Sequence, residues 1–171
     1  MDIQFEAKIS AKDLYRFNMR NAYTSVQGIL SIICAALVAF VFIWKFDKLS
    51  APYLVLFVIL FVLFLVYIPA SLWMKSKQVV KKSDVFKEPL GYSFSEEGIL
   101  ITSPTVSDDE NVVLPWEDIF KVIKNKNYIL IYTNRISAYI IPREQIADKE
   151  EEISKALLDK VEDFKLKGFN K

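Results

Sequence analysis

The stretch that decides the fold is Tyr53–Ile68, YLVLFVILFVLFLVYI, in which 14 of the 16 residues are Leu, Ile, Val or Phe. It lies within a run that carries no charged side chain between Lys48 and Lys75. A helix that crosses the hydrocarbon core of a bilayer needs about 20 apolar residues. A helix of a soluble core would keep a polar stripe for its solvent face, and this segment has none. We therefore predict a transmembrane helix over about residues 52–73.

A second uncharged run, between Arg20 and Lys45, predicts another span over about residues 24–44. It lies too deep in the chain for a signal peptide and lacks a small-residue cleavage site. Together the two spans predict a transmembrane helical hairpin over residues 21–74. Lysines and arginines are concentrated before the first span and after the second, and the connecting loop holds only Lys45 and Lys48. The positive-inside rule then predicts a multi-pass protein of the cell membrane with both termini in the cytoplasm.

Small residues line one side of the first predicted span, and they are candidates for a helix–helix contact because small side chains let helices approach closely. Two interpretations stay open: packing against the second span, or a homodimer face. Neither span contains Asp, Glu, Lys or Arg, which argues against a pump or ion-coupled transporter. The residues are Gly28, Ser31, Ala35 and Ala39.

Residues 75–87 are predicted to form a basic linker next to the membrane. Each basic group near an anionic leaflet favours binding by about 1 kcal/mol, so its lysines are candidates for contact with the membrane surface. The alternative is that they act only as topology determinants. The lysines concerned are Lys75, Lys77, Lys81 and Lys82.

The residues outside the hairpin predict a mostly β structure. In residues 1–20, Ile3–Ile9 alternates like a strand and a helix follows, with Ser10 and Asp13 in capping-box spacing. In residues 88–171, apolar segments between turn residues predict six strands. A helix is predicted to follow between a cap at Asp148 and a stop at Gly168, with an apolar stripe of Ile153, Leu157, Val161 and Phe164. The strands are Leu90–Ser95, Ile99–Ser103, Asn111–Pro115, Ile119–Lys124, Tyr128–Thr133 and Ser137–Ile141. We thus predict an α+β membrane protein with a small pleckstrin-homology-like antiparallel β-barrel, capped by a C-terminal helix.

Composition excludes several kinds of chemistry. The chain has one cysteine, Cys34, and no histidine, so an intrachain disulfide, a Cys/His zinc site and a Ser-His-Asp triad are all impossible. Residues 88–171 hold 11 Lys and Arg against 16 Asp and Glu, a net charge of −5, which disfavours nucleic acid. The acids at Asp108–Glu110 lack the remaining ligands of a calcium loop and are predicted to form a solvated loop. We expect no enzymatic activity, no metal and no cofactor.

The cluster Trp116, Glu117 and Asp118 is the most distinctive outside the spans. One interpretation makes the two acids a contact for a partner protein. The other places Trp116 and Ile119 in the core and the acids at a solvated turn. Adjacent residues of an extended strand point to opposite faces, which disfavours a shared acid–base site.

Three segments resemble the YcxB-like family of bacterial membrane proteins: Gly91–Ile99 (GYSFSEEGI), Leu114–Ile119 (LPWEDI) and Ala138–Pro142 (AYIIP). The similarity covers roughly residues 85–145. It implies a pleckstrin-homology-like cytosolic domain behind two spans, and it implies no activity or catalytic residues.

Two functions remain as expectations. The first is a non-enzymatic, membrane-anchored module whose cytosolic domain binds protein, either a partner or another copy of itself, in envelope stress or self-immunity. The second is an accessory or regulatory subunit of a transporter or other membrane complex, which would dock through its transmembrane helices.

Overall fold

The structure is a computed structural model that describes residues 3–45, 50–104 and 111–169. The chain divides into two compact units, each described here by itself. The β unit comprises Met1–Leu14 and Gln78–Lys171, and the helical unit comprises Tyr15–Lys77. The loop predicted at Asp108–Glu110 lies outside the described residues.

Helix α1 (Ala11–Thr24) starts at the predicted capping box, which is confirmed. The backbone N–H of Ser10 donates to Asp13 Oδ2 at 2.9 Å, and the Asp13 N–H donates to Ser10 Oγ at 3.3 Å. The helix ends before Ser25, whose hydroxyl oxygen accepts from the Gly28 N–H at 3.0 Å in the first turn of α2 (Val26–Lys45). The axis bends by 69° at this break. The predicted small-residue position Gly28 makes the bend feasible, because a Cβ there would lie 1.8 Å from the Ala22 carbonyl oxygen.

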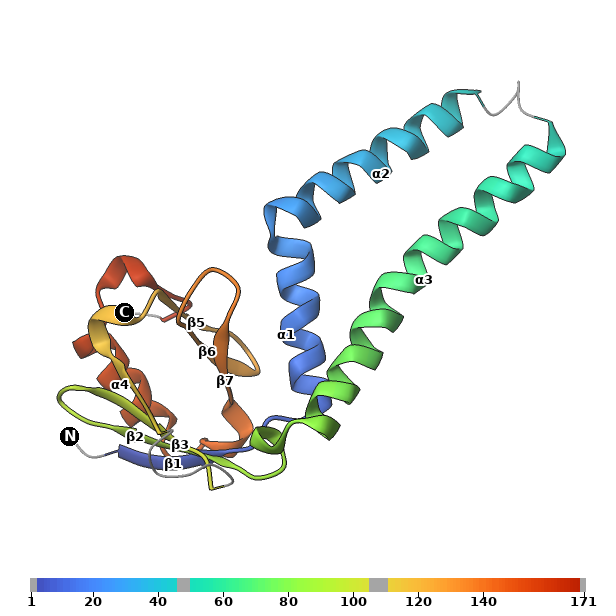
Figure 1. Ribbon diagram of the computed structural model, residues 1–171. Coiled ribbons are helices and arrows are strands. Elements are labelled where there is room, and N and C mark those ends of the chain that lie inside the picture. Colours follow the sequence, from blue (N-terminus) through green and yellow to red (C-terminus); the bar gives the residue numbers. More distant parts are fainter. Residues whose placement is uncertain (1–2, 46–49, 105–110, 170–171) are drawn as a thin grey trace. The chain divides into compact units, whose positions relative to one another are not determined.

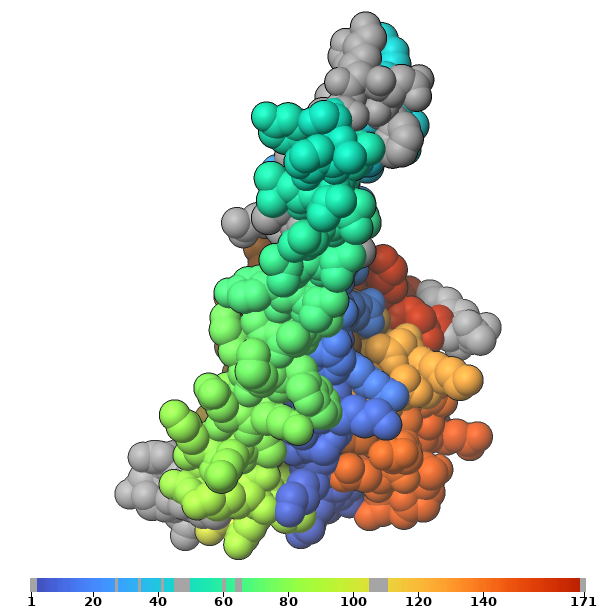
Figure 2. Space-filling view, turned by 90° about the vertical axis from the view of Figure 1, so that its right-hand side faces the viewer, coloured from blue at the N-terminus to red at the C-terminus, as the bar shows by residue number. Residues whose placement is uncertain are grey.

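Helix α3 (Ala51–Lys82) is long and apolar enough to cross a membrane, and none of its most apolar stretch is buried. Figure 2 shows the side chains along one face of α3. The helix continues through Pro69 and includes the lysines that the sequence assigned to a linker. Its 32 residues span about 48 Å, against a hydrocarbon core of roughly 30 Å.

The predicted two-helix hairpin is not confirmed. Among the described residues, α1 and α2 qualify as a second span only if the bent pair is counted as one. The straight part beyond the bend, Gly28–Trp44, has 17 residues and covers about 26 Å, which is short for a bilayer. Helices α2 and α3 contact through Phe42 and Phe57, whose stacked rings lie 3.8 Å apart.

The β unit contains two four-stranded sheets (Figure 1). The first is antiparallel, in the order β1 (Ile3–Ala7), β2 (Leu90–Phe94), β3 (Gly98–Thr102) and β4 (Val112–Pro115). The second has the order β7 (Ala138–Pro142), β6 (Tyr128–Tyr132), β5 (Lys121–Lys124) and β8 (Leu166–Lys167), with β8 parallel to β5. Short 3-10 helices η2 (Asp84–Phe86), η4 (Trp116–Asp118), η5 (Arg143–Gln145) and η6 (Asp163–Lys165) and helix α4 (Glu150–Lys160) complete the unit.

The α+β class is confirmed, but the predicted closed barrel is wrong for the part of the chain that the structure describes. The 3-10 turn η4 interrupts the chain between β4 and β5, so β5 pairs with β6 and β8 instead of extending the first sheet. The seven predicted strands are present and mostly shortened by a residue or two. Strand β6 lies inside the second sheet, and all five of its residues are buried.

The predicted C-terminal helix is shorter than its apolar stripe suggested. Helix α4 ends at Lys160 and buries Ile153 and Leu157, whereas Phe164 falls in η6 and is 81% exposed. The predicted cap at Asp148 is wrong, because Lys149 takes the N-cap position without a side-chain hydrogen bond. Gly168 does not stop the helix; it follows β8 with a φ of 82°.

Candidate functional site

The predicted contact residues Trp116, Glu117 and Asp118 together form η4, between β4 and β5. Trp116 is half-buried, and its orientation is fixed from two sides. Its indole Nε1 donates to the Ser95 carbonyl oxygen at 3.1 Å, and its ring meets that of Phe94 edge-on at 5.6 Å. Glu117 and Asp118 are exposed. The turn therefore presents part of an aromatic face and two carboxylates at the surface.

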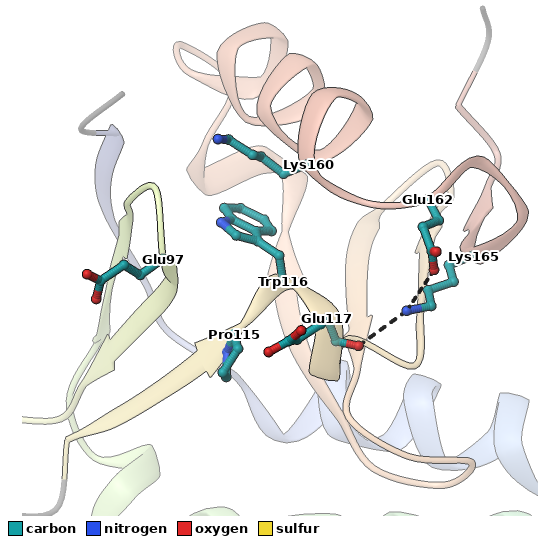
Figure 3. A pocket seen from close by; sticks show the side chains of 7 residues that line it. All are labelled: Glu97, Pro115, Trp116, Glu117, Lys160, Glu162 and Lys165. Carbon is teal, nitrogen blue, oxygen red and sulfur yellow. Dashed lines mark hydrogen bonds and ion pairs between the residues drawn. The ribbon is translucent and has the colours of Figure 1, made fainter.

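Trp116 and Glu117 line a cavity of about 520 Å³, here called the Trp116 pocket. Figure 3 shows the indole in the middle of the lining side chains. They come from three places: the turn between β2 and β3, the β4–η4 segment, and the C-terminal end of α4 with the segment that follows it. The lining residues are Glu97, Pro115, Trp116, Glu117, Lys160, Glu162 and Lys165.

Both lysines of the Trp116 pocket are engaged. The Lys160 ammonium pairs with Glu96 and holds the pKa of that carboxyl below its usual range. The Lys165 ammonium lies 3.1 Å from Glu162 Oε2 and donates to the Glu117 carbonyl oxygen at 3.2 Å. Within the described residues, the carboxylates of Glu97 and Glu117 make no ion pair. The uncompensated charge of the lining is therefore negative.

A second cavity, of about 460 Å³, lies beside α4 and is lined by Lys124, Asn125, Lys126, Arg143, Ser154, Leu158, Gly168 and Phe169. Two of its cationic side chains, Lys124 and Arg143, form ion pairs with Glu150. Arg143 Nε and Nη2 donate to the two Glu150 carboxylate oxygens at 2.9 and 2.6 Å, and Nη1 donates to the Asn125 carbonyl at 2.8 Å. Lys124 Nζ lies 2.9 Å from the same carboxylate. The hydrogen bond from Arg143 is the main reason that the pKa of Glu150 lies below its ordinary value.

The small residues of the first predicted span lie on α2. Ala35 and Ala39 are half-buried, Ser31 is exposed, and Gly28 lies at the bend. A role in helix association stays a prediction for them. The lysines at 75, 77, 81 and 82 are exposed on the last turns of α3, and the Lys77 ammonium lies 4.8 Å from the centre of the Trp73 ring.

Sequence reasoning found two lining residues of the Trp116 pocket, Trp116 and Glu117, and missed the rest. Glu97 comes from the β2–β3 turn, and the residues from 160 to 165 come from the other end of the β unit's sequence. No local pattern links these segments. The structure forms no group of three or more Asp, Glu, His or Cys side chains suited to a metal ion among the residues it describes.

Residues 94–157 match the family described as YcxB-like protein. The matched segment runs from the end of β2 into α4 and includes Glu97 and Pro115–Glu117 of the pocket, but not its lysines. Neither the curated proteins nor the solved structures gave a match to this chain. The predicted resemblance is thus confirmed: over residues 94–157 the chain is similar to the YcxB-like family.

Proposed function

We propose that the protein is a non-enzymatic, membrane-anchored module whose β unit binds another protein through the Trp116 pocket. The observation that carries the proposal is the pocket itself, because it combines a held, half-buried indole with two carboxylates that lack an ion pair within the described residues. Tryptophan is enriched at the energetic centres of protein interfaces. The order of seven strands followed by α4 also supports a pleckstrin-homology-like architecture without ring closure.

Anchoring in the membrane rests on α3, with the β unit in the cytoplasm next to the lysines at the end of that helix. The pairing of β1 with β2 supports an even number of crossings. The chain leaves the β unit after Leu14 and returns to it at Gln78, so both ends of the helical unit belong to one folded body. That body lies on one side of a bilayer. If α3 crosses, the α1–α2 segment must cross as well, with its bend near the surface or straightened.

The proposal is tested by photocrosslinking in cells. A benzoylphenylalanine placed at Trp116 is compared with one at Ile136, which is 73% exposed on the turn between β6 and β7 and serves as a control outside the pocket. We expect a discrete crosslinked protein from position 116 that is absent from position 136. Glu117→Lys should weaken that crosslink, because it reverses a charge of the pocket lining. Identical products from both positions would contradict the proposal, as would a crosslink from position 116 that Glu117→Lys leaves unchanged.

A second candidate function, docking on the helices of a membrane complex, is favoured by the uncovered apolar surface of α3 and the half-buried Ala35 on α2. Replacing Ala35 by Leu would fill the space in which another helix packs. Loss of association with a membrane complex, with the crosslink at position 116 unchanged, would support docking through the helices. Unchanged association would point to the β unit.

A further inference from the structure

We propose that the Trp116 pocket receives an arginine side chain of the partner protein, with lysine as a weaker substitute. This inference rests on the proposed function and specifies the chemistry of the partner. Three features of the pocket carry it: the aromatic face, the pattern of satisfied and unsatisfied charges, and the failure of the alternatives.

The aromatic face suits a planar cation. The hydrogen bond from the indole Nε1 to the Ser95 carbonyl and the edge contact with Phe94 hold the ring of Trp116 in place. A ring held in this way loses little conformational freedom on binding. A guanidinium stacks on a tryptophan face and still has N–H groups directed outward in its plane.

The charges of the pocket favour a cation over an anion. Its resident cations are already paired, Lys160 with Glu96 and Lys165 with Glu162. Glu117 reaches the pocket from the same turn as the indole, and Glu97 lines it from the β2–β3 turn with its carboxylate directed away from the indole (Figure 3). Neither carboxylate makes an ion pair in the described part of the chain, so Glu117 can accept hydrogen bonds from a guanidinium and Glu97 adds negative charge at the edge of the pocket.

Other occupants fit less well. A phosphate, a lipid headgroup or nucleic acid would approach two carboxylates whose charge is not compensated. A metal ion lacks a suitable group of ligands among the described residues. An apolar side chain could cover the indole but would gain nothing from the negative charges of Glu97 and Glu117. An arginine can stack on the ring and is attracted by these charges.

The test uses the full-length protein in non-ionic detergent micelles and follows the indole N–H signals by NMR. The chain has three tryptophans, and Trp116→Phe identifies the signal of interest. The probe is the peptide acetyl-Gly-Gly-Arg-Gly-Gly-amide, and its comparison peptides carry Lys, norleucine or Glu at the centre. We expect the Trp116 signal to shift with the Arg peptide, less with Lys, and not with norleucine or Glu. The other two indole signals should stay in place.

Charge-neutral variants test the role of the acids. Glu97→Gln with Glu117→Gln should weaken the Arg peptide about three- to tenfold, as expected for two solvent-exposed ion pairs. Glu144→Gln with Glu151→Gln is the matched control, since it removes the same charge from exposed sites outside the pocket and should leave binding unchanged. Raising the salt concentration should weaken binding to the unmodified protein but hardly affect the first variant.

The inference is overturned if the Arg peptide leaves the Trp116 signal in place up to its solubility limit, or if norleucine shifts it equally. It would also be overturned if Glu97→Gln with Glu117→Gln and Glu144→Gln with Glu151→Gln weakened binding of the Arg peptide equally. The comparison of peptides on the unmodified protein remains decisive if a variant fails to fold. A crosslink from position 116 together with no response to arginine would refute this inference and leave the proposed function standing.

Discussion

Replacing Tyr128 by Phe removes a single oxygen atom from a buried contact between β6 and the start of α1. The Tyr128 hydroxyl donates to Asp13 Oδ1 at 2.7 Å, while Asp13 Oδ2 accepts from the Ser10 N–H. Asp13 is 9% exposed, so water does not readily replace the lost donor. A hydrogen bond to a charged group contributes about 1.5–3 kcal/mol. We therefore expect Tyr128→Phe to lower the free energy of unfolding of the β unit by that amount.

The β unit supplies a matched control for this substitution in Tyr92. Its hydroxyl is buried and has no hydrogen-bond partner among the described residues, and burial raises the pKa of Tyr92 well above its ordinary value. Because an unpaired buried hydroxyl costs free energy, Tyr92→Phe should be neutral or stabilising. The same atom is thus removed from two buried tyrosines with opposite expected effects.

Hydrogen–deuterium exchange of the β6 amides, read by mass spectrometry in detergent, measures both effects. If these amides exchange through opening of the whole unit, a loss of about 1.5–3 kcal/mol accelerates their exchange by about 10- to 140-fold. Tyr92→Phe should leave the rate unchanged or lower it. Equal acceleration by the two variants, or none by Tyr128→Phe, would refute the assignment of the energy to the contact with Asp13.

Three further predictions concern the bend, the ion pair and the last strand. Gly28→Ala should straighten or unfold the α1–α2 junction, because its Cβ would meet the Ala22 carbonyl, and spin labels on the two helices should then move apart. Glu150→Gln should make the melting temperature depend less on pH in the acidic range. Arg143 depresses the pKa of Glu150 in the folded protein, so the ion pair stabilises the fold fully above the unfolded-state pKa near 4.5, and this stabilisation is lost as the pH falls through the folded-state pKa. Gly168→Ala should cost about 1–3 kcal/mol, since its φ is positive, and should accelerate amide exchange at β8.

The strands could be predicted because their signals are local. Alternation and turn residues are enough to place a strand such as β6, whose five apolar residues lie between Asn127 and Thr133. The number of sheets could not be predicted, because it depends on which strands pair across the 3-10 turn η4. Strand β8 has only two residues and forms by parallel pairing with β5, so it leaves no periodic signal.

Only the part of the candidate site that lies in one short segment of the sequence could be predicted. The pair Trp116–Glu117 is unusual enough to be noticed in the sequence, but its partners lie about 20 residues before it and more than 40 after it. The helix predicted from the apolar stripe is longer than α4. Val161 fits the helical spacing of apolar residues, but its backbone is already extended. Where the helix ends decides that Lys160 and Lys165 lie beside the indole, and helical periodicity alone does not determine that end.

The position of β1 constrains how the protein can assemble. Its five residues pair with β2, more than 80 residues further along the chain, and Lys8 exchanges two hydrogen bonds with Gln145 through its backbone N–H and C=O. None of these contacts can form until the helical unit has been synthesised. Contacts between such distant segments are slow to form, and an unpaired strand is prone to wrong pairing. If the helical unit crosses a bilayer an even number of times, as we propose, its insertion would bring the two ends of the unit to the same surface. The entropy of closing that long loop would then be lost during insertion, before β1 meets β2.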